Sequence, residues 1–518
     1  MAELDRQPAD TLPRVHVPLL FMTIFVVAGC GLIYELTAGA LASYVLGDSI
    51  MQFSTVIGCY LSALGLGAWL SRYVERNVVE RFIAIELAVG LIGGTSAPLL
   101  FFAFSELTWF RVVLYGLVVL IGTLVGLEVP LLMRILRQRL EFKELIARVL
   151  SVDYLGALVA SLAFPMFFVP KLGLTRTSLV FGLLNTAIAF WTTYLLRDEI
   201  RRPAALRMRC AFVLVTLSAG IAFADRLTSL AEDGLYNHDI VFAKQSAYQR
   251  IVVTRSDAGF QLFLDGNLQF ASSDEYRYHE ALVHPAFAAA EQRARVLVLG
   301  GGDGLALREI LKYPEVQRVT LVDLDPAMTE LGSRFPLLRR LNGASFEDPR
   351  VRVVHDDAMR WLADQTTQSP YDVIIVDFPD PNNFSLGKLY TTRFYALVRQ
   401  QLAAAGALVV QSTSPLFARR SFWCIAQTLR AAGFAVQPYH ATVPSFGEWG
   451  YVLARTAPFH TPTHAPLPQS EDPRYVDDAM MAALFVWSPD MREIAAEPNR
   501  LDNQVLVRYY EDEWKHWN

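Results

Sequence analysis

Long apolar stretches fill the first 230 residues of the chain, and they constrain its fold more than any other feature. Most approach the length of about 20 residues that a helix needs to cross the hydrocarbon core of a bilayer. The chain of 518 residues is 53% hydrophobic, which is high for a soluble protein. The stretches lie at residues 17–36, 53–70, 82–104, 112–132, 154–169, 179–196 and 210–224. They predict a polytopic α-helical membrane bundle of about seven helices at residues 17–226, preceded by a polar lead-in at residues 1–16 that lacks a cleavage site.

Glycines and acids inside these stretches refine this prediction. Small residues such as Gly67, Gly90 and Gly126 let membrane helices approach closely, so they predict a compact bundle. An ionised carboxylate is costly inside a membrane unless it is paired or hydrated. The acids in or near the spans are Glu35, Glu86, Glu128 and Asp153. They fit either a cation path or neutral hydrogen-bonded contacts between helices.

A glycine loop interrupted by an acid dominates the second half of the chain. Residues 296–310, VLVLGGGDGLALREI, predict a buried strand, a sharp turn and a helix, as in a nucleotide-binding βαβ unit. In such a loop, backbone N–H groups at the helix start ordinarily favour an anionic group. The carboxylate of Asp303 reverses this preference because it attracts a cation. We therefore expect the ligand in this loop to carry a positive group.

Acids also end or follow the next three predicted strands, at 318–325, 351–354 and 371–376. They are Asp323 and Asp325, Asp356 and Asp357, and Asp377 and Asp380. Any one of them is typical of a helix N-cap or a strand-end turn. However, the carboxyl ends of parallel strands meet at one edge of a sheet, where ligands usually bind. The set therefore predicts one convergent acidic site.

These motifs together resemble those of the spermidine synthases, the polyamine aminopropyltransferases. The resemblance consists of GGGDG, the VDLD acid, HDDA at 355–358 and DxxDP at 377–381, in that order. Residues 263–280, FLDGNLQFASSDEYRYHE, are similar to the LDG-x-x-Q … DE-x-x-YHE segment of the family. The resemblance covers roughly residues 248–453. With the predicted spans, it implies a membrane-bound form of this family.

The resemblance implies a fold and a reaction. The fold is an α/β Rossmann-like domain of the AdoMet-methyltransferase type, with a small N-terminal β-hairpin subdomain. The reaction moves the aminopropyl group of decarboxylated S-adenosylmethionine to putrescine, giving spermidine and methylthioadenosine. This donor is a co-substrate, and no cofactor is expected. A homo-oligomer formed through the soluble domain is also implied.

Individual roles are carried over only onto matching positions. The implied catalytic acid is Asp377. The residues implied for the donor and its nucleoside are Gln249, Gly300, Gly302, Asp323, Asp357 and Ala358. The residues implied for the ammonium groups of donor and polyamine are Tyr278, His279, Asp303 and Asp380.

The chemistry explains why these residue types occur together. The decarboxylated donor has a propylammonium tail and no carboxylate, so an acid at Asp303 suits it. A diamine arrives as a dication and needs carboxylates to replace its water. One acceptor nitrogen must lose a proton before it attacks, and Asp377 could accept that proton as a general base.

Two segments on the acceptor side depart from the family pattern. Asn382, Asn383 and Phe384 replace the Gly-Pro pair that usually follows DxxDP. Val443–Phe446 replaces an I-P-T-Y segment, so a pocket tyrosine hydroxyl is missing. Glu448 is either a further carboxylate for the polyamine or a plain loop acid. Another diamine or polyamine therefore remains open as the acceptor, as does a polyamine transporter or sensor with a non-catalytic domain.

The basic loops at 72–81, 134–148 and 197–209 bear on the side of the membrane. The positive-inside rule puts them in the cytoplasm with the N-terminus, and seven spans would then put the catalytic domain outside. The last stretch, at 210–224, has only about 15 residues, roughly 22 Å of helix. If it lies at the membrane interface instead of crossing, six spans remain. We expect the protein to lie in the cell membrane. Because the adenosyl donor is cytosolic, we expect its catalytic domain on the cytoplasmic side.

The remaining boundaries follow shifts in composition. We predict the β-hairpin subdomain at 235–291 with its hairpin at 248–270, the Rossmann-like domain at 292–455, and a proline-rich linker at 456–473. The C-terminal helical tail at 474–518 should contain a helix at 475–487 that packs on a core or docks on the membrane. The cysteines form no C-x-x-C pair and the histidines no metal-ligand spacing, so neither a disulfide nor a metal site is expected. The net charge of −5 gives no nucleic-acid signature.

Overall fold

A computed structural model describes most of the chain as two compact units, Met1–His238 and Asp239–Asn518. The described residues are 16–46, 49–106, 109–137, 142–224, 236, 238–365, 369–467 and 473–515. The predicted polar lead-in at 1–16 lies outside them, except for His16. Each unit is considered by itself.

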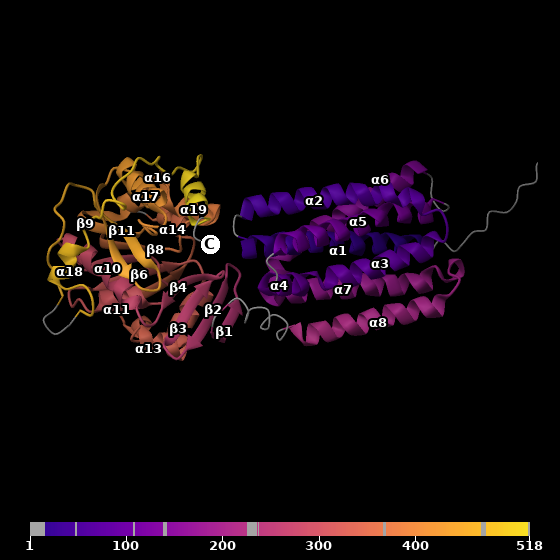
Figure 1. The fold of residues 1–518 in the computed structure, drawn as a ribbon, viewed down its shortest axis with the longest axis horizontal. Coiled ribbons are helices and arrows are strands. Elements are labelled where there is room, and N and C mark those ends of the chain that lie inside the picture. Colours follow the sequence, from indigo (N-terminus) through magenta and orange to yellow (C-terminus); the bar gives the residue numbers. More distant parts are fainter. Residues whose placement is uncertain are drawn as a thin grey trace, which may run out of the picture. The chain divides into compact units, whose positions relative to one another are not determined.

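The first unit is a bundle of long helices that lie alongside one another (Figure 1). Every apolar stretch predicted from the sequence is helical in the structure. The helices are α1 (His16–Leu46), α2 (Ser49–Leu70), α3 (Val78–Gly94), α4 (Ser96–Glu106), α5 (Phe110–Leu136), α6 (Phe142–Ala163), α7 (Val169–Leu195) and α8 (Pro203–Ala222). Short helical turns, η1 (Ser71–Tyr73), η2 (Phe164–Phe168) and η3 (Arg197–Glu199), connect some of them.

Six helical segments among the described residues are long and apolar enough to cross a membrane. One of them, Lys143–Leu195, has 53 residues, which would measure about 80 Å as a straight helix. It is not straight, because Gly173 has the non-helical angles φ 72° and ψ 176° and because α6 and α7 both pack along α1. The segment therefore folds back into two helices, so the described residues contain seven long apolar helical segments.

The last of these passes is longer than the sequence suggested. Helix α8 has 20 residues, about 30 Å, because it begins at Pro203 and includes Arg207 and Arg209. The guanidinium of Arg207 lies 3.6 Å from the ring centroid of Tyr194, and its Nη2 donates to the backbone oxygen of Thr193. These contacts let the helix extend through a basic segment. By length and composition, α8 can therefore cross a bilayer.

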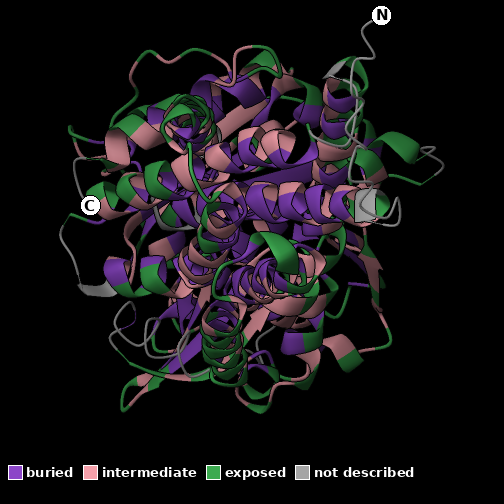
Figure 2. Cartoon of the chain, turned by 90° about the vertical axis from the view of Figure 1, so that its right-hand side faces the viewer, coloured by how far each residue is buried: buried purple, intermediate pink, exposed green. Residues whose placement is uncertain are grey.

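Glycine contacts hold the helices close, as predicted. A Cβ atom added at Gly126 would lie 2.2 Å from the backbone oxygen of Leu64, and one at Gly182 would lie 2.5 Å from that of Gly90. Many large apolar side chains of this unit are instead exposed. Figure 2 colours the exposed residues of the chain green. Met166 is 78% exposed, Phe212 71% and Met22 63%. Outward apolar surface of this extent is unusual for a soluble helical bundle.

The second unit begins with a four-stranded antiparallel sheet in the order β1-β2-β3-β4. Its strands are β1 (Asp239–Gln245), β2 (Arg250–Ser256), β3 (Gly259–Leu264) and β4 (Asn267–Ala271). The predicted hairpin at 248–270 is thus only part of a larger sheet, because β1 adds a strand at its edge. The predicted subdomain also included α10 (Glu275–Ala289), but this helix packs on the larger sheet, with Leu282 and Phe287 fully buried in its core.

The larger sheet has seven strands in the order β10-β11-β9-β8-β5-β6-β7. Five of them are parallel, and β10 and β11 are antiparallel additions at one edge. The strands are β5 (Arg295–Gly300), β6 (Arg318–Asp323), β7 (Val351–His355), β8 (Tyr371–Asp377), β9 (Leu402–Gln411), β10 (Ala435–Val443) and β11 (Gly447–Arg455). The chain order reverses between β5 and β8, which places a topological switch point between their carboxyl ends.

Helices cover both faces of this sheet, which confirms the Rossmann-like fold (Figure 1). Helices α10 and α11 (Leu305–Leu311) contribute to one core, and α14 (Ala358–Asp364), α16 (Thr392–Gln401) and α17 (Arg419–Ala431) to the other. Helices α12 (Pro326–Arg334) and α13 (Pro336–Leu341) pack against the small sheet. The short segments between these elements are η4 (Ser345–Glu347), α15 (Phe384–Gly387) and η5 (Lys388–Tyr390).

The C-terminal tail packs onto this domain as part of its core. The predicted helix at 475–487 is wrong in length, because α18 spans only Asp478–Ala483. After it, Leu484 accepts a hydrogen bond from the backbone N–H of His440, and the ring of Phe485 contacts Tyr439. The last helix, α19 (Val505–Trp514), lies on α17, where Glu513 accepts hydrogen bonds from the backbone N–H groups of Arg420 and Ser421.

Candidate active site

The glycine loop after β5 meets the end of β8 at the switch point of the sheet. Gly300 is paired with Asp377 across the two strands, and the N–H of Gly301 donates to the backbone oxygen of Asp377 over 3.2 Å. Gly300 has a φ of 84°, and a Cβ atom there would lie 2.2 Å from the same oxygen. Only glycine therefore fits at this position. The approach brings the glycine loop and the predicted catalytic acid together.

The loop also contacts the end of β6. A Cβ atom at Gly302 would lie 2.5 Å from Oδ2 of Asp323. Asp323 accepts a hydrogen bond of 2.8 Å from the backbone N–H of Asp325. Burial raises the pKa of Asp323 to about 7, although hydrogen bonds from the backbone N–H groups of Asp325 and Gly302 oppose this. The predicted glycine and the predicted ribose acid thus lie side by side.

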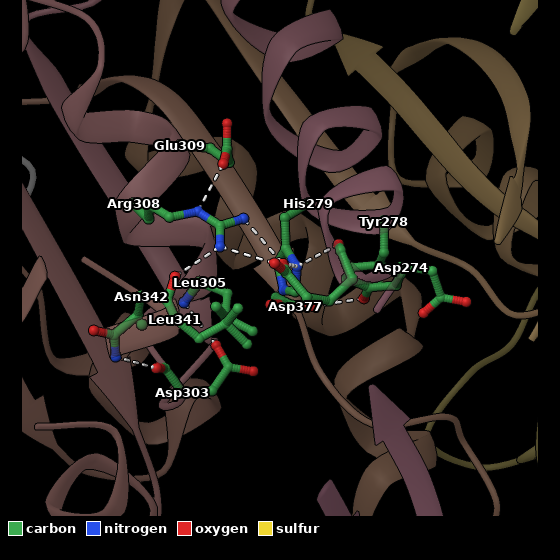
Figure 3. Close-up of polar contacts among 12 residues, drawn as sticks. Asp274, Tyr278, His279, Asp303, Leu305, Arg308, Glu309, Leu341, Asn342 and Asp377 are labelled. Atoms are coloured by element: carbon green, nitrogen blue, oxygen red, sulfur yellow. Dashed lines mark hydrogen bonds and ion pairs between the residues drawn. The ribbon is translucent and has the colours of Figure 1, made fainter. Parts of the chain in front are cut away.

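Asp303 follows in the same loop and lies near Asp377. Its Oδ1 accepts the backbone N–H of Leu305 over 2.9 Å, and its backbone oxygen accepts from Nδ2 of Asn342 over 2.8 Å. Figure 3 shows these contacts, which fix the loop. Burial raises the pKa of the Asp303 carboxyl. Two neighbouring, partly buried carboxylates favour a cationic ligand.

Asp377 receives a hydrogen bond from a predicted neighbour. The hydroxyl of Tyr278, on α10, donates to Oδ1 of Asp377 over 2.6 Å (Figure 3). Burial and the charge of Asp303 together raise the pKa of Asp377 to about 6, against the opposing effects of His279 and the Tyr278 hydroxyl. A carboxylate with a raised pKa is a better proton acceptor than an ordinary one. The geometry thus suits Asp377 as a base.

His279 belongs to a buried charge network rather than standing alone. Its Nδ1 lies 2.9 Å from Oε2 of Glu275, whose two carboxylate oxygens each accept a hydrogen bond of 2.9 Å from Arg308. Despite burial, the pairing with Glu275 raises the pKa of His279 to about 9, and Asp303 and Asp377 add to this effect. An imidazolium beside these two acids competes with an ammonium ligand. A role for His279 in contacting polyamine stays a prediction.

Gln249 lies in the turn between β1 and β2 and reaches β6. Its Nε2 donates to Oδ2 of Asp325 over 3.0 Å, and the hydroxyl of Ser246 donates to the same oxygen over 2.7 Å. Asp325 also caps α12, because its Oδ1 accepts the backbone N–H of Ala327. The small sheet is thereby tied to the strand end that carries Asp323.

Asp357 and Ala358 begin α14 after β7. The Asp357 carboxylate accepts the backbone N–H groups of Met359 and Arg360, and its Oδ2 lies 2.6 Å from Nζ of Lys388. Burial alone would raise the pKa of Asp357, but the contacts with Lys388 and the helix N–H groups hold it below its usual range. Lys388 was not predicted from the sequence, because it belongs to none of the motifs.

Asp380 is held by residues that the sequence analysis did not single out. Its carboxylate accepts hydrogen bonds from Nε2 of Gln411 over 3.2 Å, from the hydroxyl of Thr413 over 2.9 Å, and from the hydroxyl of Tyr510 on α19. Burial raises the pKa of Asp380, although the hydrogen bonds from these donors act in the opposite direction. Thr413 has a φ of 55°, which is rare for a β-branched residue. Such a strained backbone conformation is typical of functional sites.

On the acceptor side, where the sequence lacks the family's pocket tyrosine, Tyr510 supplies a hydroxyl. In place of the family's tyrosine segment, the hydroxyl of Ser445 donates to Asp274 over 3.0 Å, and Phe446 packs on Trp449. No local pattern could have identified Tyr510, since it lies 130 residues after Asp380 in the chain.

Glu448 is occupied within the β10–β11 pair. It accepts from the hydroxyl of Thr442 over 2.6 Å, and its Oε2 lies 2.7 Å from Nδ1 of His440. These contacts fit the plain loop acid that the sequence analysis left open. Among the residues that the structure describes, no group of three or more His, Cys, Asp or Glu could hold a metal ion.

The arrangement can therefore bind a nucleoside along β5 and β6 and a cation beyond it. Asp303, Asp377 and Asp380 come together at the carboxyl edge of the sheet, as predicted. All three are partly buried, and Asp377 and Asp380 are hydrogen-bonded by neutral donors. A cationic nucleoside donor and an amine acceptor fit such a site.

Comparison with known proteins agrees with this chemistry. The spermine/spermidine synthase domain matches residues 275–461. The chain is 54% identical to polyamine aminopropyltransferase 1 of Ralstonia nicotianae, over 98% of both chains. It is 48% identical to the polyamine aminopropyltransferase of Leptospira interrogans, over 96% of this chain and 98% of that one.

A solved spermidine synthase in complex with the transition state analogue AdoDATO is 25% identical, covers 48% of this chain and 86% of that one, and has a TM-score of 0.45. The relatives in Ralstonia and Leptospira match over nearly the whole length, including the helical first unit. The chain thus belongs to the polyamine aminopropyltransferase family and is an aminopropyltransferase.

Proposed function

We propose that the enzyme transfers the aminopropyl group of decarboxylated S-adenosylmethionine to putrescine, giving spermidine and methylthioadenosine. The observation that carries this proposal is the set of partly buried carboxylates at the switch point, next to a glycine loop. A donor that kept its methionine carboxylate would bring an anion close to Asp303. The decarboxylated donor brings an ammonium instead.

The donor is proposed to lie along the ends of β5 and β6. Asp323 accepts hydrogen bonds from the ribose hydroxyls, and Gly302 leaves room for that carboxylate because any side chain there would collide with it. Asp357 and Ala358 lie at the end of β7, on the adenine side. Asp303 pairs with the propylammonium tail. Gln249 orders the small sheet over the nucleoside through its bond to Asp325.

The acceptor is proposed to lie between Asp377 and Asp380. One amine nitrogen gives a proton to Asp377 and attacks the propyl carbon next to the sulfonium. A C–N bond forms while the C–S bond breaks, and the electron pair stays on sulfur in neutral methylthioadenosine. Tyr278 positions Asp377 through the bond of 2.6 Å. The second ammonium of the acceptor pairs with Asp380.

Putrescine is the proposed acceptor because it is a diamine, with one nitrogen for Asp377 and one for Asp380. The alternative is a different diamine or polyamine, since the acceptor side is built from Tyr510 and Thr413 rather than from the segments usual in the family. The binding-only alternative, a transporter or sensor without turnover, is not favoured by the comparisons, because the matching relatives are named as transferases.

We also propose that the first unit crosses a lipid bilayer with seven passes. The length and hydropathy of its segments and its outward apolar side chains support this. An odd number of passes puts the N-terminus and the catalytic unit on opposite faces. We place the catalytic unit in the cytoplasm, where the adenosyl donor is, although the basic loops would then face outward against the positive-inside rule.

A C-terminal epitope tag tests the side of the membrane. In spheroplasts of the expression host, an added protease should leave the tag intact and remove it only after the cells are lysed. Removal from intact spheroplasts would put the catalytic unit outside. The soluble unit is proposed to form the homo-oligomer, and the mass of the detergent-purified enzyme by light scattering tests this.

The replacement of Asp377 by asparagine tests the reaction itself. General-base catalysis contributes typically about 10²–10⁴-fold, so Asp377→Asn should lose at least that factor in methylthioadenosine release. Donor binding, measured by calorimetry with methylthioadenosine, should change little because the nucleoside contacts remain. Unchanged turnover in the variant would remove Asp377 from the mechanism.

A further inference from the structure

The helical unit contains a cluster of buried polar side chains that the transfer reaction does not use. Glu86 on α3 and Glu128 on α5 are 0% and 1% exposed, and Asn185 on α7 and Tyr34 on α1 are buried beside them. We call these four residues the bundle cluster. They come from four different helices, so the packing of the whole unit brings them together.

Contacts show that the members of the bundle cluster are neighbours. Nδ2 of Asn185 donates to the backbone oxygen of Glu86 over 2.9 Å and to its Oε2 over 2.8 Å. Glu86 and Glu128 interact electrostatically with each other and with the hydroxyl of Tyr34. Tyr34 also lines a small cavity with Glu35 and Tyr60.

Several polar atoms of the bundle cluster have no partner. They are Oε1 of Glu86, Oε1 of Glu128, Oδ1 of Asn185 and the hydroxyl of Tyr34. Buried polar atoms are nearly always hydrogen-bonded, so each unpaired one needs an explanation. The amide oxygen of Asn185 accepts, and the oxygens of Glu86 and Glu128 accept when these groups are ionised, so a donor would satisfy three of the four atoms.

A positively charged partner would allow both acids to remain ionised. Among the residues that the structure describes, neither Glu86 nor Glu128 has a lysine or arginine within ion-pair distance, and two carboxylates inside a bundle are costly without a cation. A metal ion does not fit, since the described residues include no group that could hold one. An alkylammonium, with three N–H donors and a positive charge, matches both the acceptors and the acids.

We propose that the bundle cluster is a second binding site, specific for the ammonium group of an aliphatic amine such as putrescine or spermidine. This inference extends the proposed function by giving the first unit a polyamine site. It does not depend on the catalytic roles, because no residue of the bundle cluster belongs to the catalytic unit. Polyamine at this site would let the helical unit respond to the acceptor or the product of the reaction.

Equilibrium dialysis of radiolabelled putrescine and spermidine against detergent-purified full-length enzyme tests the proposal. The wild type should bind two equivalents of one amine per chain. Glu86→Gln and Glu128→Gln, alone or together, should weaken one of them at least tenfold and leave kcat and the KM of the acceptor unchanged. Glu75→Gln makes the same change at an exposed position of the same unit and should keep both equivalents.

Each outcome decides between the alternatives. A single equivalent in the wild type, or two equivalents retained in the double variant, would overturn the proposal and mean that the acids hold only protons or water. Tyr34→Phe removes one unpaired hydroxyl and should weaken the second site about threefold while the helical content by circular dichroism stays constant. If the wild type showed no turnover, that result would count against the proposed reaction and not against this site.

Discussion

The hydrogen bond from Tyr278 to Asp377 gives the sharpest test of the proposed base. Tyr278→Phe removes a donor that lies 2.6 Å from Oδ1 of Asp377 and leaves the ring in place. A hydrogen bond to a charged group contributes about 1.5–3 kcal/mol. Because one pKa unit corresponds to about 1.4 kcal/mol, the pKa of Asp377 should rise by about one to two units. We take about one unit, since the positive charge of His279 also stabilises the ionised form.

The sign of the pH effect follows from the direction of this shift. Burial raises the pKa of Asp377 to about 6 in the wild type, and only the deprotonated carboxylate can act as a base. Transfer should therefore fall as the pH drops through about 6, and through about 7 in the variant. Relative to the wild type, the variant should be slower by about tenfold at pH 5 and about twofold at pH 7, and equal at pH 9.

The assay is the pH dependence of kcat for methylthioadenosine release. Tyr439→Phe is the matched control, because its hydroxyl donates to the backbone oxygen of Ala281 and not to the site. The control should lose some thermal stability and keep the acid limb of the profile. An unmoved acid limb in Tyr278→Phe, or an equal loss at every pH, would refute the reasoning.

Three further substitutions test separate parts of the site. Asp303→Asn should weaken the decarboxylated donor about tenfold or more and methylthioadenosine little, because only the former carries the tail ammonium; competition binding measures both. Gly302→Ala should weaken both ligands alike, since the new Cβ would lie 2.5 Å from Oδ2 of Asp323, and the same titration checks this. Tyr510→Phe removes a hydrogen bond to the Asp380 carboxylate. It should therefore raise the acceptor KM about threefold to tenfold and leave the donor KM unchanged in steady-state kinetics.

The controls for these substitutions lie nearby. Tyr509→Phe changes the neighbouring tyrosine on α19, whose ring lies 4.0 Å from the guanidinium of Arg420, and should leave the acceptor KM as it is. Equal losses for donor and methylthioadenosine in Asp303→Asn would contradict the assignment of the tail. A donor KM that rises together with the acceptor KM in Tyr510→Phe would mean that α19 acts only on stability.

The sequence predicted those parts of the site that depend on local patterns. A buried strand followed by glycines identifies the β5 loop, and acids after three further strands must meet at one edge once those strands are parallel. The positions of Asp303, Asp323 and Asp377 follow from this rule alone. The apolar stretches of the first unit were equally clear, because helix length and hydropathy are local properties.

Other parts depend on contacts between distant segments and could not be predicted. Tyr510 reaches Asp380 only because Glu513 fixes α19 on α17. The helix predicted at 475–487 is shorter in the structure, because Phe485 packs against Tyr439 after the end of α18. Strand β1 was missed, since its residues DIVFAKQ carry only a weak alternation and pair through the neighbouring strand.

The most direct test of the central claim is the release of methylthioadenosine by the detergent-purified full-length enzyme. The assay supplies decarboxylated S-adenosylmethionine with putrescine, longer diamines or spermidine, and intact S-adenosylmethionine serves as the control donor. We predict release only with the decarboxylated donor, dependent on an amine acceptor and fastest with putrescine. Equal release from intact S-adenosylmethionine, or no release with any acceptor, would contradict the proposed reaction.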